Sequence, residues 1–239
     1  LYFFVLVYSK RKETCVCFNP RKFGWEKAIV LGVCGVGIPA SIQNLLNVTG
    51  MTVLNNFTSS FGSDAVAAMG IAQKINMVPL YFSLGLSQGL MPLISYNYAS
   101  GNIERMKKAL LFTIKISLAF MFTVSIGYYF GAGFLTRLFM KNETIVSYGS
   151  RFLQGLCLTL PFLCMDFLAV GVFQACGLGT KAFIFAILRK IILEIPALYI
   201  WNYIMPLYGL AYAQPTAEVV LSIAAVIVLY QLFHKLEHK

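Results

Sequence analysis

Six apolar stretches, each long enough to cross a lipid bilayer, constrain this chain more than any other feature of its sequence. They cover residues 27–60, 64–98, 103–133, 144–176, 180–204 and 207–233. A membrane-spanning helix needs about 20 predominantly apolar residues. Only 12% of the chain is charged, against about 25% in ordinary soluble domains. The sequence therefore predicts an all-α integral membrane protein with six complete transmembrane helices.

The ends of the chain differ from these stretches. Residues 1–9 are apolar up to Tyr8, but as a helix these eight residues would span only about 12 Å of a hydrocarbon core about 30 Å thick. We interpret them as the end of a preceding, truncated transmembrane helix, which makes the chain a fragment of a longer protein. A basic loop over 10–26 follows, then a six-helix lobe over 27–233 and a tail over 234–239.

The net charge of +10 is distributed unevenly between the two sides of the predicted bundle. One side carries Lys10, Arg11, Lys12, Arg21, Lys22, Lys27, Arg105, Lys107, Lys108, Lys181, Lys235 and Lys239, and the other has Arg137, Lys141 and Arg151 nearby. The side rich in Lys and Arg is normally cytoplasmic. We therefore expect a multi-pass plasma-membrane protein with its C-terminus in the cytoplasm, and the charge calls for no nucleic-acid partner.

Proline interrupts five of the six apolar stretches, at positions 39, 79, 92, 161, 196 and 215. Each proline removes a helical hydrogen bond and frees the carbonyl four residues earlier, as Pro161 does for Cys157. Such breaks are tolerated in membranes where neighbouring helices or polar side chains satisfy the freed group. We expect helices that bend around a cavity or during a transport cycle.

Polar side chains recur at helical spacing in the first two stretches and predict the lining of a substrate cavity. The members of this set are Asn44, Asn47, Asn55, Lys74, Met77, Tyr81 and Gln88. Interhelical hydrogen bonding explains single amides equally well. It explains Lys74 less well, because intramembrane charges usually face a bundle interior or a watery cavity.

Three acidic residues, Asp166, Glu194 and Glu218, lie inside the apolar stretches. Lys190 precedes Glu194 by one helical turn, so these two residues could simply neutralise each other. Asp166 has no basic residue within a turn of its own stretch. It must find a partner on another helix, accept a proton or bind a cation, and exchanging one ion for another is the chemistry of an antiporter.

Four segments resemble the C-terminal half of the multidrug and toxic compound extrusion (MATE) family. They are "GIPASIQNLL" (37–46), "DAVAAMGIAQKI" (64–75), "GLSQGLMPLISYNYASGN" (85–102) and "AQPTAE" (213–218). The resemblance extends over about residues 27–233. It implies a twelve-helix antiporter with two six-helix lobes around a central cavity, which expels organic cations or other small amphiphiles in exchange for sodium ions or protons. This chain would then need the missing N-terminal lobe as its partner.

The resemblance also implies roles for individual residues. In the NorM branch of the family an aspartate in a Cys-Met-Asp triplet belongs to the cation site, and the same triplet ends here at Asp166. That branch also has a glutamate at the position of Asn47, which cannot ionise. A sodium site at Asp166 would therefore be incomplete, and coupling to protons or a rearranged site is an equal alternative. Glu194, Glu218 and Asn47 are expected to join Asp166 in the site for the coupling cation or proton.

Other functions fit the sequence less well. A flippase for lipid-linked saccharides shares the two-lobe plan but should have a more basic cavity, and only Lys74, Lys115, Arg189 and Lys190 are available for it. A passive channel would not need a buried exchangeable carboxylate. An enzyme would need a nucleophile–base pair or a metal constellation, and we find no such motif and no motif for a cofactor. We therefore expect the transporter and no enzymatic activity.

Overall fold

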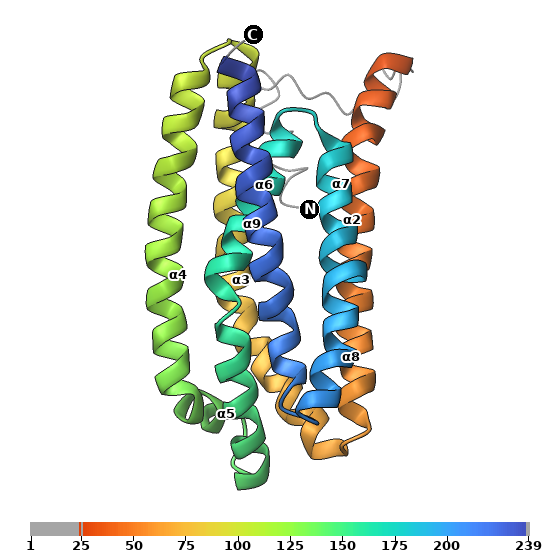
Figure 1. Ribbon diagram of the computed structural model, residues 1–239, viewed down its shortest axis with the longest axis vertical. Coiled ribbons are helices and arrows are strands. Elements are labelled where there is room, and N and C mark those ends of the chain that lie inside the picture. Colours follow the sequence, from red (N-terminus) through yellow and green to blue (C-terminus); the bar gives the residue numbers. More distant parts are fainter. Residues whose placement is uncertain (1–23, 25, 238–239) are drawn as a thin grey trace, which may run out of the picture. The chain divides into compact units, whose positions relative to one another are not determined.

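The computed structural model describes residue 24 and residues 26–237, which are helical and contain no strand (Figure 1). The chain separates into two units, residues 1–35 and 36–239, and α2 begins in the first and ends in the second. The helices are α2 (Lys27–Ser59), α3 (Ser63–Ala99), α4 (Ile103–Phe139), α5 (Glu143–Cys157), α6 (Leu160–Ala175), α7 (Gly179–Ile187), η2 (Leu188–Glu194), α8 (Ile195–Ile204) and α9 (Leu210–Glu237).

These helices follow the predicted apolar stretches closely. Four of them, α2, α3, α4 and α9, are each long and apolar enough to cross a membrane, and the bent pair α5–α6 makes a fifth such segment. The stretch predicted at 180–204 forms the consecutive segments α7, η2 and α8. The predicted truncated helix over 1–9 and most of the loop over 10–26 lie outside the described residues. The predicted tail over 234–239 is helical through Glu237, because α9 continues to that residue.

The fourth predicted stretch is broken at Leu158 and Thr159, just before Pro161, and its two halves meet at 46°. The carbonyl of Cys157, which cannot receive an N–H from Pro161, instead accepts a hydrogen bond from the Ser125 hydroxyl of α4 at 2.8 Å. A side chain on a neighbouring helix therefore satisfies the group that the proline frees, as the sequence predicted.

The fifth stretch contains a π-helical segment, η2, immediately before Pro196. The N–H of Ile195 donates to the Lys190 carbonyl five residues earlier. Because the proline ring cannot complete the α-helical ladder, the wider π turn accommodates the break. The segment brings Arg189, Lys190 and Glu194 into the interior, where all three are buried.

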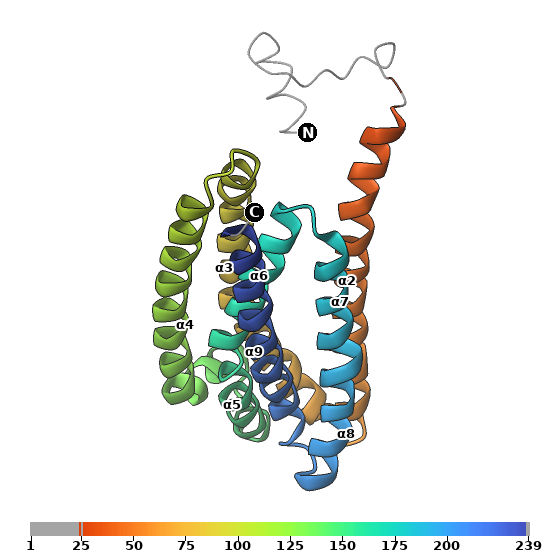
Figure 2. The same ribbon diagram turned by 45° about the horizontal axis from the view of Figure 1, so that its top comes forward.

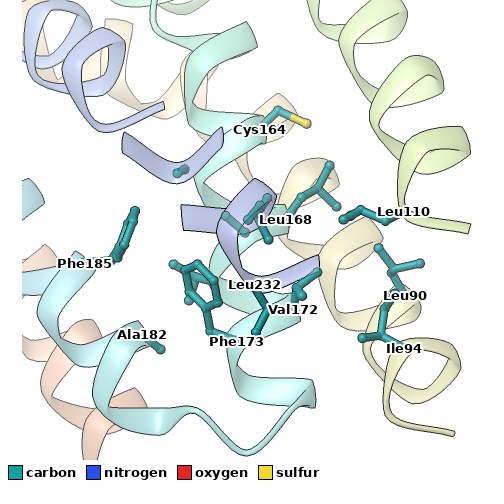
Figure 3. Packing of buried hydrophobic residues seen from close by; sticks show 14 of the residues in the cluster. Leu90, Ile94, Leu110, Cys164, Leu168, Val172, Phe173, Ala182, Phe185 and Leu232 are labelled. Atoms are coloured by element: carbon teal, nitrogen blue, oxygen red, sulfur yellow. The ribbon is translucent and has the colours of Figure 1, made fainter. Parts of the chain in front are cut away.

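Within the second unit, α3, α6 and α9 lie between α4 and the α7–α8 segment in both views (Figures 1 and 2). Helix α6 is the core helix, since 12 of its 16 residues are buried. Its Leu168, Val172 and Phe173 pack among apolar side chains of the neighbouring helices (Figure 3). The Phe173 ring lies 5.3 Å from that of Phe185 on α7. Asp166 on α6 therefore faces the protein interior and not the lipid.

Candidate functional site

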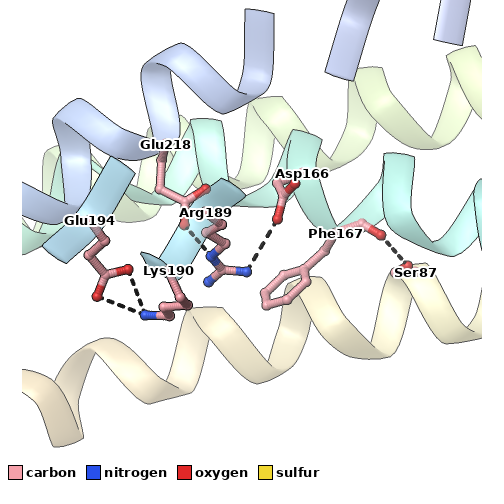
Figure 4. Close-up of polar contacts among 7 residues, drawn as sticks. All are labelled: Ser87, Asp166, Phe167, Arg189, Lys190, Glu194 and Glu218. Atoms are coloured by element: carbon pink, nitrogen blue, oxygen red, sulfur yellow. Dashed lines mark hydrogen bonds and ion pairs between the residues drawn. The ribbon is translucent and has the colours of Figure 1, made fainter. Parts of the chain in front are cut away.

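Five buried charged side chains from three helical segments form a cluster in the interior of the second unit. Asp166 comes from α6, Arg189, Lys190 and Glu194 come from η2, and Glu218 comes from α9 (Figure 4). Asp166, Arg189 and Glu218 are 1%, 3% and 0% exposed. Charges buried this deeply are stable only when they are paired and hydrogen-bonded. The three intramembrane acids singled out in the sequence are therefore brought together in one place.

Arg189 lies between two carboxylates. Its Nη1 donates a hydrogen bond to Asp166 Oδ2 at 3.2 Å, and its Nε lies 2.7 Å from Glu218 Oε1 in an ion pair. The guanidinium carbon also lies 5.1 Å from the ring centroid of Phe167, within cation–π distance. Asp166 has thus found its partner on another helical segment, the first of the three outcomes that the sequence left open.

The second pair in the cluster is local. Lys190 Nζ donates to both oxygens of Glu194, at 2.8 and 2.6 Å, one turn along the same segment. The expected mutual neutralisation of this pair is therefore present. Gly50 of α2 lies against it, since a Cβ there would be 3.1 Å from Lys190 Cδ and 3.4 Å from Glu194 Oε1. A larger residue at position 50 would push against the pair.

The cluster carries one more negative than positive charge when every member is ionised, because three carboxylates face two cations. Among the described residues, Asp166 Oδ1 and both oxygens of Glu218 have no hydrogen-bond partner, although Glu218 Oε1 is in an ion pair with Arg189 Nε. Buried polar atoms without a partner are rare, and a water molecule, an ion or a functional role usually explains them. Protonation of one carboxylate would balance the charges of the cluster.

The predicted cavity residues lie apart from the cluster. Asn44, Asn55, Lys74, Tyr81 and Gln88 are exposed, and Asn47 and Met77 are half-buried. None of the seven residues lines the hollow near Arg137 and Glu143 or the hollow between α3 and α4. Asn47 lies three residues before Gly50 and so shares a helical face with it. The role of the seven residues in a cavity stays a prediction.

Sequence reasoning missed Arg189 as a site residue and considered it only for a basic cavity. The signal was present, because Arg189 lies in an apolar stretch and an intramembrane cation must find a counter-charge. The sequence could not show which acid it would choose, since Asp166 and Glu218 are 23 and 29 residues away along the chain. The pairing depends on how α6, η2 and α9 pack.

Comparison with known proteins identifies the family. The sequence model of the MatE family matches residues 39–200. The chain belongs to the MatE family. It is 33% identical over 236 residues to the multidrug export protein MepA of Staphylococcus haemolyticus, and 31% identical over 235 residues to MepA of Staphylococcus saprophyticus. These names describe export, in agreement with the expectation of a transporter rather than an enzyme.

Solved structures of the family share the fold. A multidrug resistance MATE transporter of the MOP superfamily in an outward-facing conformation matches with a TM-score of 0.90 at 22% identity, over 100% of this chain and 54% of that one. The Vibrio cholerae MATE transporter VcmN in its bent form matches with a TM-score of 0.87 at 17% identity, over 98% and 53%. The two MepA alignments likewise cover 98% of this MatE chain but 51% of each relative. The chain thus spans about half the length of the curated relatives it matches.

Proposed function

We propose that this MatE chain is one lobe of a secondary active antiporter that expels small cationic or amphiphilic organic compounds in exchange for protons or sodium ions. The observation that carries the proposal is the buried cluster, which has one excess negative charge and three carboxylate oxygens without hydrogen-bond partners. One of the three, Glu218 Oε1, is in an ion pair with Arg189. The MepA relatives are named multidrug export proteins, which also supports a role in export. The missing lobe would complete the transporter and its substrate cavity.

The coupling ion would act at the Asp166–Arg189–Glu218 triad. Arg189 can remain paired with one carboxylate while the other takes up the incoming ion, so the cation is never left alone in the interior. A sodium ion at Asp166 would need Arg189 to withdraw, because the guanidinium donates to Asp166 Oδ2 at 3.2 Å. A proton requires less rearrangement, and the triad therefore favours protons.

An ion that exchanges here would drive transport only by binding two conformations with different affinity. The bend at Leu158–Thr159 and the π segment at 188–194 lie on the two elements that carry Asp166 and Arg189. A change of ion at the triad would alter the packing between these elements. The exposed polar residues of α2 and α3, Lys74 and Gln88 among them, would face the substrate.

The uneven distribution of basic residues supports a cytoplasmic C-terminus. The α3–α4 turn, the α6–α7 loop and the end of α9 lie at one end of the second unit (Figure 1). The basic residues adjoining them are Arg105, Lys107, Lys108, Lys181 and Lys235. The opposite end has Arg137, Lys141 and Arg151. By the positive-inside rule the first end would face the cytoplasm of a plasma-membrane protein.

Gradient-driven efflux tests the proposal. The transporter that carries this chain is reconstituted in vesicles, and efflux of a fluorescent organic cation is driven separately by a pH gradient and a sodium gradient. We expect one gradient to drive efflux, and both Asp166→Asn and Glu218→Gln to abolish that dependence. Glu143→Gln is the matched control, because its carboxylate is exposed and pairs with Arg137 outside the cluster.

The outcomes separate the alternatives. Unchanged gradient dependence in Asp166→Asn removes that residue from the mechanism. Efflux that needs no gradient favours a passive channel. Binding of the fluorescent cation to each variant, measured without a gradient, distinguishes loss of coupling from loss of folding. A saccharide flippase is disfavoured, because Arg189 and Lys190 are already paired with carboxylates inside the protein.

A further inference from the structure

An apolar groove of about 570 Å³ lies between α3 and α4 and includes none of the cluster residues. Gly85 and Gly89 form its floor, and a Cβ at either position would have no atom within 4 Å. Leu93 and Phe112 on its walls are 40% and 66% exposed. The hydroxyl of Thr113, a polar lining residue, already donates to the Ala109 carbonyl of its own helix. The groove therefore suits a hydrocarbon chain.

The groove has the depth of one lipid leaflet. It runs along α3 from Leu93 to Phe82, which is about 16 Å at the helical rise. The rings of Phe82 and Phe120, whose centroids are 4.1 Å apart, close its deep end. Helix α3 has 37 residues, or about 55 Å, so a hydrocarbon core of about 30 Å begins about 12 Å from each helix end. The groove begins near that level, since Leu93 lies about 9 Å from the end of α3 at Ala99.

Positive charge lies above the open end of the groove. Arg105 precedes Ala109 by one turn of α4, and Lys108 likewise precedes Phe112, so both cations share the side of α4 that lines the groove. Both are exposed, at the level expected for lipid phosphates. Glu104 pairs with Lys108 at 2.6 Å, and with Lys107 the first turn and a half of α4 still carries two more positive than negative charges. Basic residues at a membrane surface attract anionic lipids.

We propose that the groove between α3 and α4 is a binding site for an anionic phospholipid. One acyl chain lies over Gly85 and Gly89, and the phosphate lies against Arg105 and Lys108. Two features support this assignment: the groove is apolar and as deep as one lipid leaflet, and basic residues lie beside its open end at the level of the lipid headgroups. It is independent of the coupling ion and of the exported compound.

Native mass spectrometry of the delipidated transporter, titrated with phosphatidylglycerol or with phosphatidylcholine, tests the site. Gly89→Leu fills the floor and is expected to lose one retained lipid of either kind. Arg105→Gln is expected to weaken the binding of phosphatidylglycerol about five-fold, the factor that corresponds to about 1 kcal/mol per lost charge. The same change should leave the binding of phosphatidylcholine unaltered. The matched controls are Gly127→Leu, on α4 beyond the deep end of the groove, and Lys181→Gln, a basic residue beside the α6–α7 loop.

A second measurement covers the case in which Gly89→Leu does not fold. Phosphatidylglycerol with a photoreactive group near the end of one acyl chain should label the wild-type transporter within residues 82–93 or 109–120. Labelling confined to other segments overturns the proposal. So does equal loss of both lipids in Arg105→Gln, or an unchanged number of retained lipids in a correctly folded Gly89→Leu. Any of these three results would instead favour a helix of the missing lobe as the occupant of the groove.

Discussion

Replacing Arg189 with glutamine is the sharpest test of the charge cluster, because this one change removes the partner of two buried carboxylates. Asp166 Oδ2 loses its donor at 3.2 Å, and Glu218 Oε1 loses its ion pair at 2.7 Å. The excess negative charge of the cluster rises from one to two. Glutamine retains an amide donor and much of the side-chain volume, so the change is mainly electrostatic.

The expected cost follows from the burial of the pair. Removing one partner of a buried ion pair typically costs about 3–5 kcal/mol, because the other charge stays in the interior without compensation. For a domain of about this size each kcal/mol lowers the melting temperature by about 2–4 °C, so Arg189→Gln should melt roughly 6–20 °C lower. The thiols of Cys157 and Cys164 are buried, and a thiol-reactive dye would therefore follow the melting of the purified transporter.

Two further variants define the result. Arg189→Gln combined with Glu218→Gln removes one of the stranded carboxylates and should recover part of the lost melting temperature. Arg137→Gln is the control, because its pair with Glu143 is 62% and 77% exposed and should be worth about 0–1 kcal/mol. The reasoning is wrong if Arg189→Gln melts like the wild type, or if adding Glu218→Gln lowers the melting temperature further.

Two packing predictions concern the bends and contacts that hold α6 in place. Ser125→Ala should lower the free energy of unfolding by about 1–3 kcal/mol, because it removes the hydrogen-bond donor of the Cys157 carbonyl. Thr123→Ala should lower it less, since the Thr123 hydroxyl bonds to the Ala119 carbonyl on an exposed side of its own helix. Equal melting temperatures of the two variants would refute the comparison. Gly171→Ala should also lower the melting temperature, because the added Cβ would collide with Ser87 Oγ. Combining it with Ser87→Gly should restore part of the lost melting temperature. If the double variant shows no recovery, the collision with Ser87 is not the cause of the loss.

The architecture was largely predictable from the sequence because membrane burial imposes a coarse and repeated pattern. Long apolar stretches end at glycine and asparagine, and the observed turns use the same residues. Gly101 and Gly177 have φ values of 73° and 72°, in the left-handed region that glycine adopts readily. Asn102 and Asn142 cap the next helices by accepting hydrogen bonds from Arg105 N and Thr144 N. These are local effects, and local residues determine them.

The charge cluster was only partly predictable, because its members come from separate segments. The Lys190–Glu194 pair followed from one-turn spacing. The choice of Arg189 as the common partner of Asp166 and Glu218 depends on the inward turn of the π segment before Pro196, a feature that periodicity of 3.6 residues cannot anticipate. In an α-helix the three charged residues of η2 would span about 140° of the circumference. The wider π turn narrows that arc, and all three are buried.

A carboxylate that is buried and already paired cannot exchange an ion by itself, and this changes how coupling at Asp166 is to be understood. A proton or cation that reaches Asp166 must compete with Arg189, which would be costly if Arg189 had no other partner. Glu218 supplies that partner at 2.7 Å. The proposed unit of exchange is therefore the triad, and the proposed coupling requires both carboxylates. Glu194 is paired with Lys190 and contributes to the electrostatic field of the cluster, whereas Asp166 and Glu218 are the carboxylates that pair with the Arg189 guanidinium.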